Sequence, residues 1–209
     1  MIGEIESAIM AKLKAASESG YFGPAKLRGI ESMSGKTPSE DDVKKALANA
    51  PCAWVSFLSA SPTDNDFASQ FESEAGFTVI MIDRHLGSGQ QARQGTATTR
   101  GAYPLGEDAM RLLHGQQLGL DIAPLQCQAI RPIANDVIDG GQGSFVAVEF
   151  QTRYVVGLPS DAEIAAMANF ETFHADWDIK PFIDPAPAAV PLATGAADAT
   201  DTVILETLP

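Results

Sequence analysis

The chain has 209 residues, of which 45% are hydrophobic, so it is long and apolar enough to bury the core of one domain. Its formal net charge is −13 at pH 7. A surface of that sign repels the phosphate backbone, which argues against sequence-independent binding of nucleic acid. No run approaches the roughly 20 apolar residues that cross a bilayer, so no membrane partner is expected.

The N-terminal residues predict an amphipathic helix. Ile5, Ile9 and Leu13 recur at steps of four and mark one face of a helix over residues 2–18. Charged residues interrupt the apolar positions, so this segment is not typical of a signal peptide, and a cytoplasmic compartment is expected. A short strand over residues 25–32 would follow.

A second helix is predicted to begin near residue 38. Thr37 would be its N-cap, Pro38 would take the first helical position, and Glu40 would complete a capping box. Val43 and Leu47 would form its buried side.

The middle of the chain reads as strands, one long loop and one helix. β-branched and aromatic residues gather in four apolar segments that predict strands. Residues 61–70 are polar and are interpreted as a connection between the first two strands. A helix is expected at residues 106–115, and glycines in the connection before the last strand favour a hairpin. The four predicted strands are residues 52–60, 77–85, 125–133 and 143–157.

The segment 86–103 is interpreted either as a flexible loop or as an interaction arm. It contains four glycines and almost no large apolar residue, so it offers no face to bury. A connection of this length in a compact domain is usually functional or disordered. Arg84, Arg93 and Arg100 are its candidate contact residues.

The C-terminal region is acidic. Residues 158–209 contain one Lys and nine Asp/Glu, a local charge of −8. A capping box at residues 160–163 predicts a helix with Ile164 facing inward. Residues 172–180 alternate between apolar and polar and predict a half-buried strand or arm. A Pro/Ala-rich linker over 181–200 and an apolar patch over 202–207 would follow.

The polar side of that alternating segment is a candidate interaction face. It carries His174, Asp176 and Asp178. Same-face residues on a strand lie about 6.6 Å apart, whereas metal ligands converge within about 2–2.6 Å of one point. A solvated or interfacial polar face is therefore favoured over a metal site.

Enzyme motifs are incomplete. Gly35-Lys36-Thr37 resembles the end of a phosphate-binding P-loop, but Ile30 stands where the motif needs its first glycine. Ala92 replaces the third glycine of a dinucleotide fingerprint. Neither a nucleophile elbow nor a pair of catalytic carboxylates stands out. No cofactor is expected, and the two cysteines, Cys52 and Cys127, are interpreted as free thiols.

The order of these segments resembles a known family. The suggestive pieces are "VIMIDRH…AYPLGEDAMRLLHG" and the late strand "AVEFQTRYVV", which is followed by an F-x-x-x-W-D stretch. Over about residues 1–180 the chain is similar to the tail protein of Mu-like bacteriophages that is regarded as a tail terminator. The Pro/Ala-rich tail lies outside this resemblance.

The resemblance implies an α/β (α+β) subunit with a twisted mixed or antiparallel sheet packed against helices. It implies one domain over residues 1–180, with 181–209 as a linker and extended C-terminal arm. Copies would form a ring, expected to be hexameric, on the end of the tail tube. The ring would stop tube polymerisation and bind the head–neck connector.

The expected partners are other copies of the chain, the tail tube protein and the connector, with the tail sheath as a further candidate. DNA would pass through the ring without specific binding. The protein would be assembled in the host cytoplasm and reside in the virion. The family implies no catalytic residues. Two alternatives stay open: a neighbouring head–tail connector or neck protein, and a small cytoplasmic nucleotide- or metal-binding enzyme that uses Lys36 or the His174 face.

Overall fold

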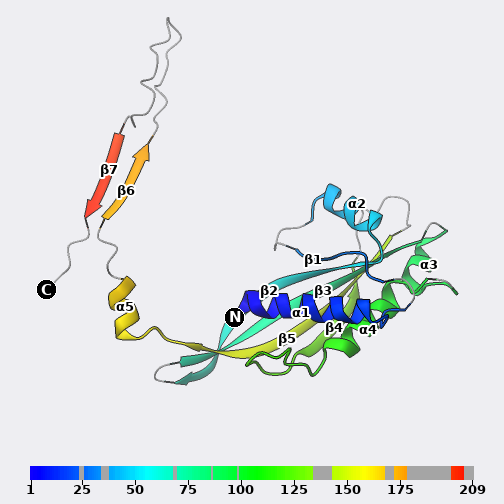
Figure 1. Cartoon of the computed structure of the whole chain (residues 1–209), viewed down its shortest axis with the longest axis horizontal. Coiled ribbons are helices and arrows are strands. Elements are labelled where there is room, and N and C mark those ends of the chain that lie inside the picture. Colours follow the sequence, from blue (N-terminus) through cyan, green and yellow to red (C-terminus); the bar gives the residue numbers. More distant parts are fainter. Residues whose placement is uncertain are drawn as a thin grey trace, which may run out of the picture. The chain divides into compact units, whose positions relative to one another are not determined.

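The computed structural model describes residues 1–23, 26–33, 38–67, 70–85, 87–97, 99–133, 143–167, 172–177 and 199–204. The chain divides into two compact units, Met1–Gly157 and Leu158–Pro209. The expected domain limit at residue 180 stays a prediction. Figure 1 labels the elements, which are α1 (Ile2–Glu18), β1 (Ile30–Ser32), α2 (Glu40–Ala48), β2 (Cys52–Phe67), β3 (Gln70–Arg84), α3 (Gly89–Gln94), α4 (Ala102–Leu113), β4 (Gln126–Pro132), β5 (Gly143–Gly157), α5 (Asp161–Met167), β6 (Thr172–Trp177) and β7 (Ala199–Ile204).

The first unit is built on a mixed five-stranded sheet. The strand order is β1-β2-β3-β5-β4. Only β1 runs parallel to its neighbour, and the other three pairs are antiparallel. The three long strands, β2, β3 and β5, lie side by side through the middle (Figure 1). The predicted fold class, a mixed sheet packed against helices, is confirmed.

The polar segment 61–70 was wrongly predicted to be a connection. Its residues 61–67 and 70 belong to strands, because β2 pairs with β3 as far as Phe67 and Gln70. The pairs shift register between Phe57 and Ser59 and again between Pro62 and Asp66. Backbone hydrogen bonds between strands do not require apolar side chains, so a hairpin that extends past the helices can be polar. An apolar pattern finds only the part that is covered.

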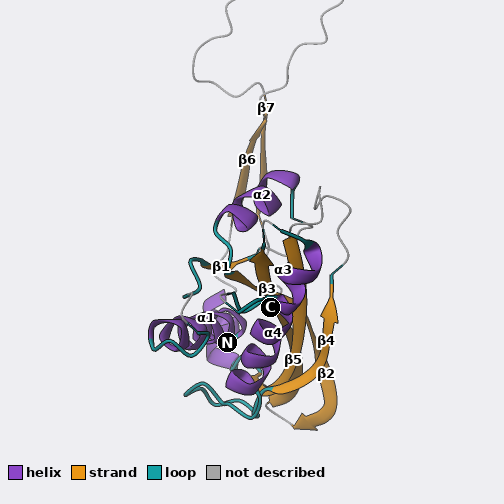
Figure 2. Cartoon of the chain, turned by 90° about the vertical axis from the view of Figure 1, so that its right-hand side faces the viewer, coloured by secondary structure: helices purple, strands orange, loops and turns teal. Residues whose placement is uncertain are grey.

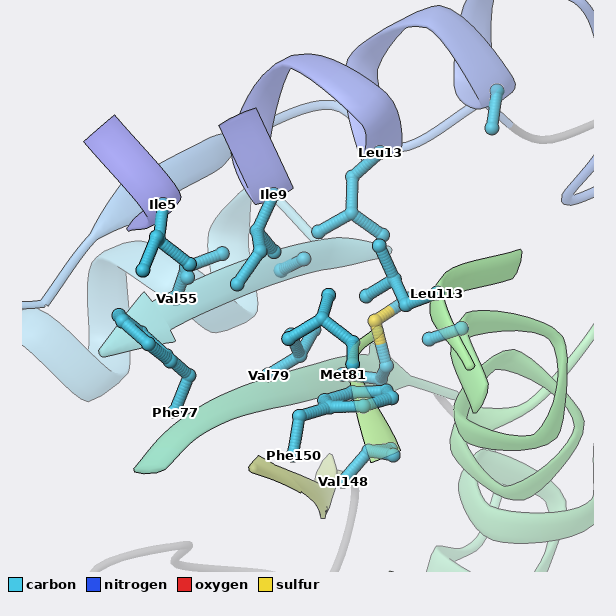
Figure 3. Packing of buried hydrophobic residues seen from close by; sticks show 14 of the residues in the cluster. Ile5, Ile9, Leu13, Val55, Phe77, Val79, Met81, Leu113, Val148 and Phe150 are labelled. Carbon is cyan, nitrogen blue, oxygen red and sulfur yellow. The ribbon is translucent and has the colours of Figure 1, made fainter. Parts of the chain in front are cut away.

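One face of the sheet is covered by α1 and α4. Ile5, Ile9 and Leu13 of α1 point toward the sheet, and Leu113 of α4 reaches the same cluster (Figure 3). These four side chains are fully buried. They meet the alternate residues of the central strands, which share this face because side chains alternate along a strand. The sheet residues labelled in Figure 3 are Val55, Phe77, Val79, Met81, Val148 and Phe150.

The other face of the sheet is covered by α2. Val43 and Ala46 of this helix pack on Trp54, Ile82 and Phe145. The edge-on view in Figure 2 separates α2 from α1 and α4. The central strands are therefore apolar on both faces where α2 lies over them. This explains why their segments read as nearly continuous apolar runs.

The start of α2 differs from the prediction. Its N-cap is Ser39, whose hydroxyl accepts a hydrogen bond from the Asp42 N–H at 3.2 Å. The Asp42 carboxylate accepts the Ser39 N–H at 3.1 Å. The capping box is thus Ser39–Asp42, two residues after the predicted Thr37 N-cap. Thr37 itself lies outside the described residues.

The second unit contains α5 and the two-stranded sheet of β6 and β7. The predicted capping box is confirmed, because the Ser160 N–H donates to the Glu163 carboxylate at 2.8 Å. Ile164 was predicted to face inward but is 50% exposed. The antiparallel register pairs His174 with Thr202 and Asp176 with Thr200. Part of the predicted terminal apolar patch is therefore strand β7.

Among the helices that the structure describes, none is both long and apolar enough to cross a membrane.

Candidate interaction surface

The outermost strand β4 presents an open edge. Its one strand neighbour in the described sheet is β5. On the opposite side, the Cys127 N–H donates a hydrogen bond to His114 Nδ1 at 3.1 Å. From Gln128 to Arg131, no described strand pairs with this side. Unpaired backbone groups on an edge strand form a template for pairing with another chain.

A groove lies between this edge and the end of α4. Its volume is about 510 Å³. Met110 and Arg111 line it from α4, and Ile130 lines it from β4. Ile130 is 39% exposed although it is a large apolar side chain. The remaining lining residues are His114, Cys127, Gln128 and Ala129.

A bulge brings these residues to the surface. The β4–β5 register moves from Cys127 opposite Phe150 to Ala129 opposite Glu149, so Gln128 has no partner. An extra residue bends the strand and locally increases its twist. After the bulge, Ile130 stands opposite Val148, and Arg131 stands opposite Ala147. Ile130 and Arg131 therefore lie on opposite faces of the strand.

The cation that lines the groove is Arg111, and no Asp or Glu is among the lining residues. The Arg111 side chain is 64% exposed and reaches Glu107 at 3.7 Å and Asp108 at 3.9 Å. Arg131, 66% exposed, forms an ion pair with Glu149. Exposed pairs of this kind contribute at most about 1 kcal/mol, so both guanidinium groups can exchange partners at low cost.

The described residues of the segment 86–103, which are 87–97 and 99–103, are largely folded against the unit. Residues 89–94 form α3, whose Ala92 is fully buried, and α4 begins at Ala102. The Ser88 hydroxyl caps α3 by accepting the Gln91 N–H at 3.2 Å. The prediction that this segment has no face to bury is wrong, because small residues let two backbone stretches approach closely.

Two glycines make that close approach. Gly95 and Gly101 both have φ of +83°. A Cβ atom on Gly95 would lie 2.2 Å from the Arg100 carbonyl oxygen, and one on Gly101 would lie 2.2 Å from the Gly95 nitrogen. Only glycine fits such positions. The segment is therefore held by backbone-to-backbone packing.

Buried carboxylates hold the same segment. The Asp83 carboxylate accepts N–H groups from Arg84 at 2.8 Å and from Gly101 at 3.0 Å. Burial raises the pKa of Asp83 above its usual value, and these two hydrogen bonds partly offset the effect. Asp108 is only 6% exposed and pairs with Arg100 at 2.5 Å. Neither acid was identified as a site from the sequence, where both read as ordinary polar ends of a strand and a helix.

The three arginines predicted to act together have different surroundings. Arg100 forms an ion pair with Asp108, although its side chain is still 42% exposed. Arg93 is exposed on α3, and Arg84 is exposed at the end of β3. The role of all three arginines as contact residues stays a prediction. The residues of the polar C-terminal face also stay a prediction: His174 and Asp176 lie in β6, and Asp178 lies outside the described residues.

A second cavity, of about 420 Å³, lies beside α2 and β1. Glu31, Asp42, Lys45 and Cys52 are among its lining residues. The Cys52 thiol donates to the Ala46 carbonyl oxygen at 3.3 Å, and burial raises its pKa to about 12. A thiol with this pKa stays protonated at neutral pH and is a poor nucleophile. Both cysteines are free.

The alternative of a nucleotide-binding enzyme depends on residues that the structure does not describe. Gly35, Lys36 and Thr37 of the partial P-loop lie outside the described residues. Within the part of the chain that is described, no group of three or more His, Cys, Asp or Glu residues is placed to hold a metal ion.

The fold is thus that of a small α+β protein with an open β4 edge beside a groove. The profile of the family described as "Bacteriophage Mu, Gp37" matches residues 1–155. The chain belongs to this family and is a structural tail protein of a Mu-like phage.

Among solved structures, the chain is similar to one component of a particle described as "Virion of native gene transfer agent (GTA) particle". The two chains share 14% sequence identity and superpose with a TM-score of 0.43. The similarity covers 71% of this chain and 92% of the other. No curated protein matches the chain.

Proposed function

We propose that this tail protein is the tail terminator. Copies close into a ring, expected to contain six, on the end of the tail tube, stop its polymerisation and provide the surface for the head–neck connector. The family match over residues 1–155, which spans nearly all of the first unit, is the observation that carries the proposal.

The geometry of the first unit supports ring closure. A ring needs heterologous contacts, in which two different surfaces of one subunit meet. The sheet has two unlike edges: β1 pairs with β2 over three residues, and β4 carries the open edge beside the groove. A net charge of −13 suits a channel through which DNA passes without adhering.

The test is the length of the tails made without this protein. A phage with a stop codon in this gene should produce tubes of irregular excess length that lack heads, as seen by negative-stain electron microscopy. Supplying the full chain in trans should restore the normal length and head joining. Tails of normal length in its absence would overturn the proposal. Tails of normal length that fail to join heads would favour the neighbouring connector.

A second measurement addresses the ring itself. Six copies of 22.0 kDa sum to about 132 kDa, which light scattering after gel filtration distinguishes from a monomer. The same sample tests the enzyme alternative. A rise in melting temperature with ATP–Mg²⁺ or divalent metal ions would favour a nucleotide- or metal-binding protein, because ligands that bind only the folded state stabilise it.

A further inference from the structure

In the described part of the second unit, the sheet has two strands, β6 and β7, of six residues each. Isolated two-stranded hairpins are marginal in water and need a further strand or a packed face. A third strand on the free edge of β6 would supply both.

The pattern of β6 matches what the β4 edge offers. Phe173, Ala175 and Trp177 alternate with His174 and Asp176. A strand paired with β4 would place its alternate residues on the two faces of that edge. One face of the edge carries Ile130 and the apolar part of the groove, and the other carries Arg131.

Charge favours the same pairing. Residues 158–209 carry a net charge of −8, from one Lys and nine Asp/Glu. The groove is lined by Arg111 and by no acid, although Arg111 also reaches Glu107 and Asp108 on its own helix. Complementary potentials steer association and determine which partner is accepted.

We propose that the β4 edge and its groove receive strand β6 from the C-terminal unit of a second copy. The inference deepens the proposed function and rests on it, because a head-to-tail ring is what supplies the second copy. Backbone hydrogen bonds from Gln128 to Arg131 add the strand. The apolar positions of β6 are assigned to the Ile130 face of the edge and the Asp176 position to the Arg131 face, because neighbouring positions of a strand alternate between its two faces. The mode is strand addition to an exposed sheet edge.

Cross-linking tests the pairing directly. In the full chain with Cys127→Ser, the variants Ile130→Cys and Ala175→Cys each place one new thiol on the apolar side of the two strands. Cys52 stays unreactive because burial raises its pKa to about 12. A short bifunctional maleimide should join the protein that carries both substitutions into a ladder of dimers and higher multimers. Each single variant should stay at the monomer position.

The cross-linked products show whether the link joins two copies of the chain or two sites within one copy. A ladder supports the proposal. An internal link, seen as a monomer band whose linked peptides come from one copy in a mixture of isotope-labelled and unlabelled protein, overturns it. Absence of any link also overturns it.

Charge reversal supplies an independent test. Arg131→Glu should weaken self-association, measured by sedimentation, by about tenfold, and adding Asp176→Arg should restore it. The control is Lys14→Glu, a reversal at an exposed position of α1 that should leave association unchanged. Equal effects at Lys14 and Arg131, or a failure of Asp176→Arg to restore association, would contradict the pairing.

These outcomes separate the inference from the proposed function. If the ladder is absent but rings form and tails have normal length, the strand pairing is wrong and the terminator role stands. If tails have normal length without the protein, the terminator role is wrong whatever the cross-links show.

Discussion

The connection between β3 and α4 and the outer strand β4 both contain glutamine, alanine and arginine but have opposite surroundings. The connection also contains four glycines, and β4 contains none. Residues 87–97 and 99–101 fold back on the unit, with Ala92 buried and Arg100 paired to a buried acid. By contrast, β4 leaves Ile130 and Arg131 exposed. The comparison teaches that a high content of glycine and arginine does not mean that a segment is free to bind a partner.

The largest difference between the two regions should come from the glycine contact. Gly101→Ala should destabilise the protein by about 3 kcal/mol or more, since it combines an unfavourable φ with a backbone clash. Urea unfolding measures this loss. Gly115→Ala is the matched control, because Gly115 has φ of +78° but no atom within 4 Å of the added Cβ. Equal losses at both positions would mean that the close approach contributes nothing.

Removing the charge that faces Asp108 should have the next largest effect. Arg100→Met leaves a carboxylate that is 6% exposed without its nearest cation. The expected loss is about 1–3 kcal/mol, moderated by Arg111, which lies 3.9 Å from the same acid. Arg93→Met, on the exposed side of α3, should change the unfolding free energy by less than about 0.5 kcal/mol. A loss at Arg93 as large as that at Arg100 would remove the contrast between the two arginines.

Asp83 should make the anchored segment sensitive to pH. Burial raises the pKa of Asp83 in the folded protein above the usual 3.8, so the folded state binds this proton more tightly than the unfolded state. The resulting penalty is fully present above the raised pKa and is relieved as pH falls through it toward 3.8. The unfolding free energy of the wild type, relative to Asp83→Asn, should therefore increase as pH falls through that window. A difference that is constant with pH would rule out this linkage.

The edge should show the smallest effect on stability. Ile130→Ser removes an apolar side chain that is already 39% exposed, so the unfolding free energy of the monomer should change by less than about 1 kcal/mol. Ile9→Ala, at a fully buried position, should lose about 2–5 kcal/mol. Chemical unfolding of both variants at low protein concentration measures the contrast. A loss at Ile130 comparable with that at Ile9 would mean that the edge is part of the core.

Periodicity predicted most elements of the first unit because they pack on the sheet. The spacing of Ile5, Ile9 and Leu13 gave α1 with its observed bounds. The apolar runs located the covered parts of β2, β3 and β5 but not the polar extension of the β2–β3 hairpin past Leu58. That extension is determined by backbone hydrogen bonds between β2 and β3, and these bonds do not require a particular pattern of apolar and polar side chains.

The candidate site was harder to predict, because it depends on contacts distant in sequence. The groove joins Met110 on α4 to Ile130 on β4, and neither residue stands out in its own segment. The exposure of Ile130 follows from β4 being last in the sheet, which strand order decides. Arg100 read as a contact residue because its partner Asp108, eight positions away, is brought to it only by the start of α4 at Ala102.

Local patterns in the amino-acid sequence were enough to locate α1, α2, α4 and α5 but not α3, together with the cores of the strands, the capping box at Ser160 and the resemblance to a phage tail protein, since each of these depends on neighbouring residues or on their order. Only the tertiary structure decided that residues 87–97 and 99–101 are anchored and that β4 is open. The physical reason is that burial and pairing depend on which segments meet in space. The same residue types can therefore occur in a segment anchored to the unit or in an exposed edge strand.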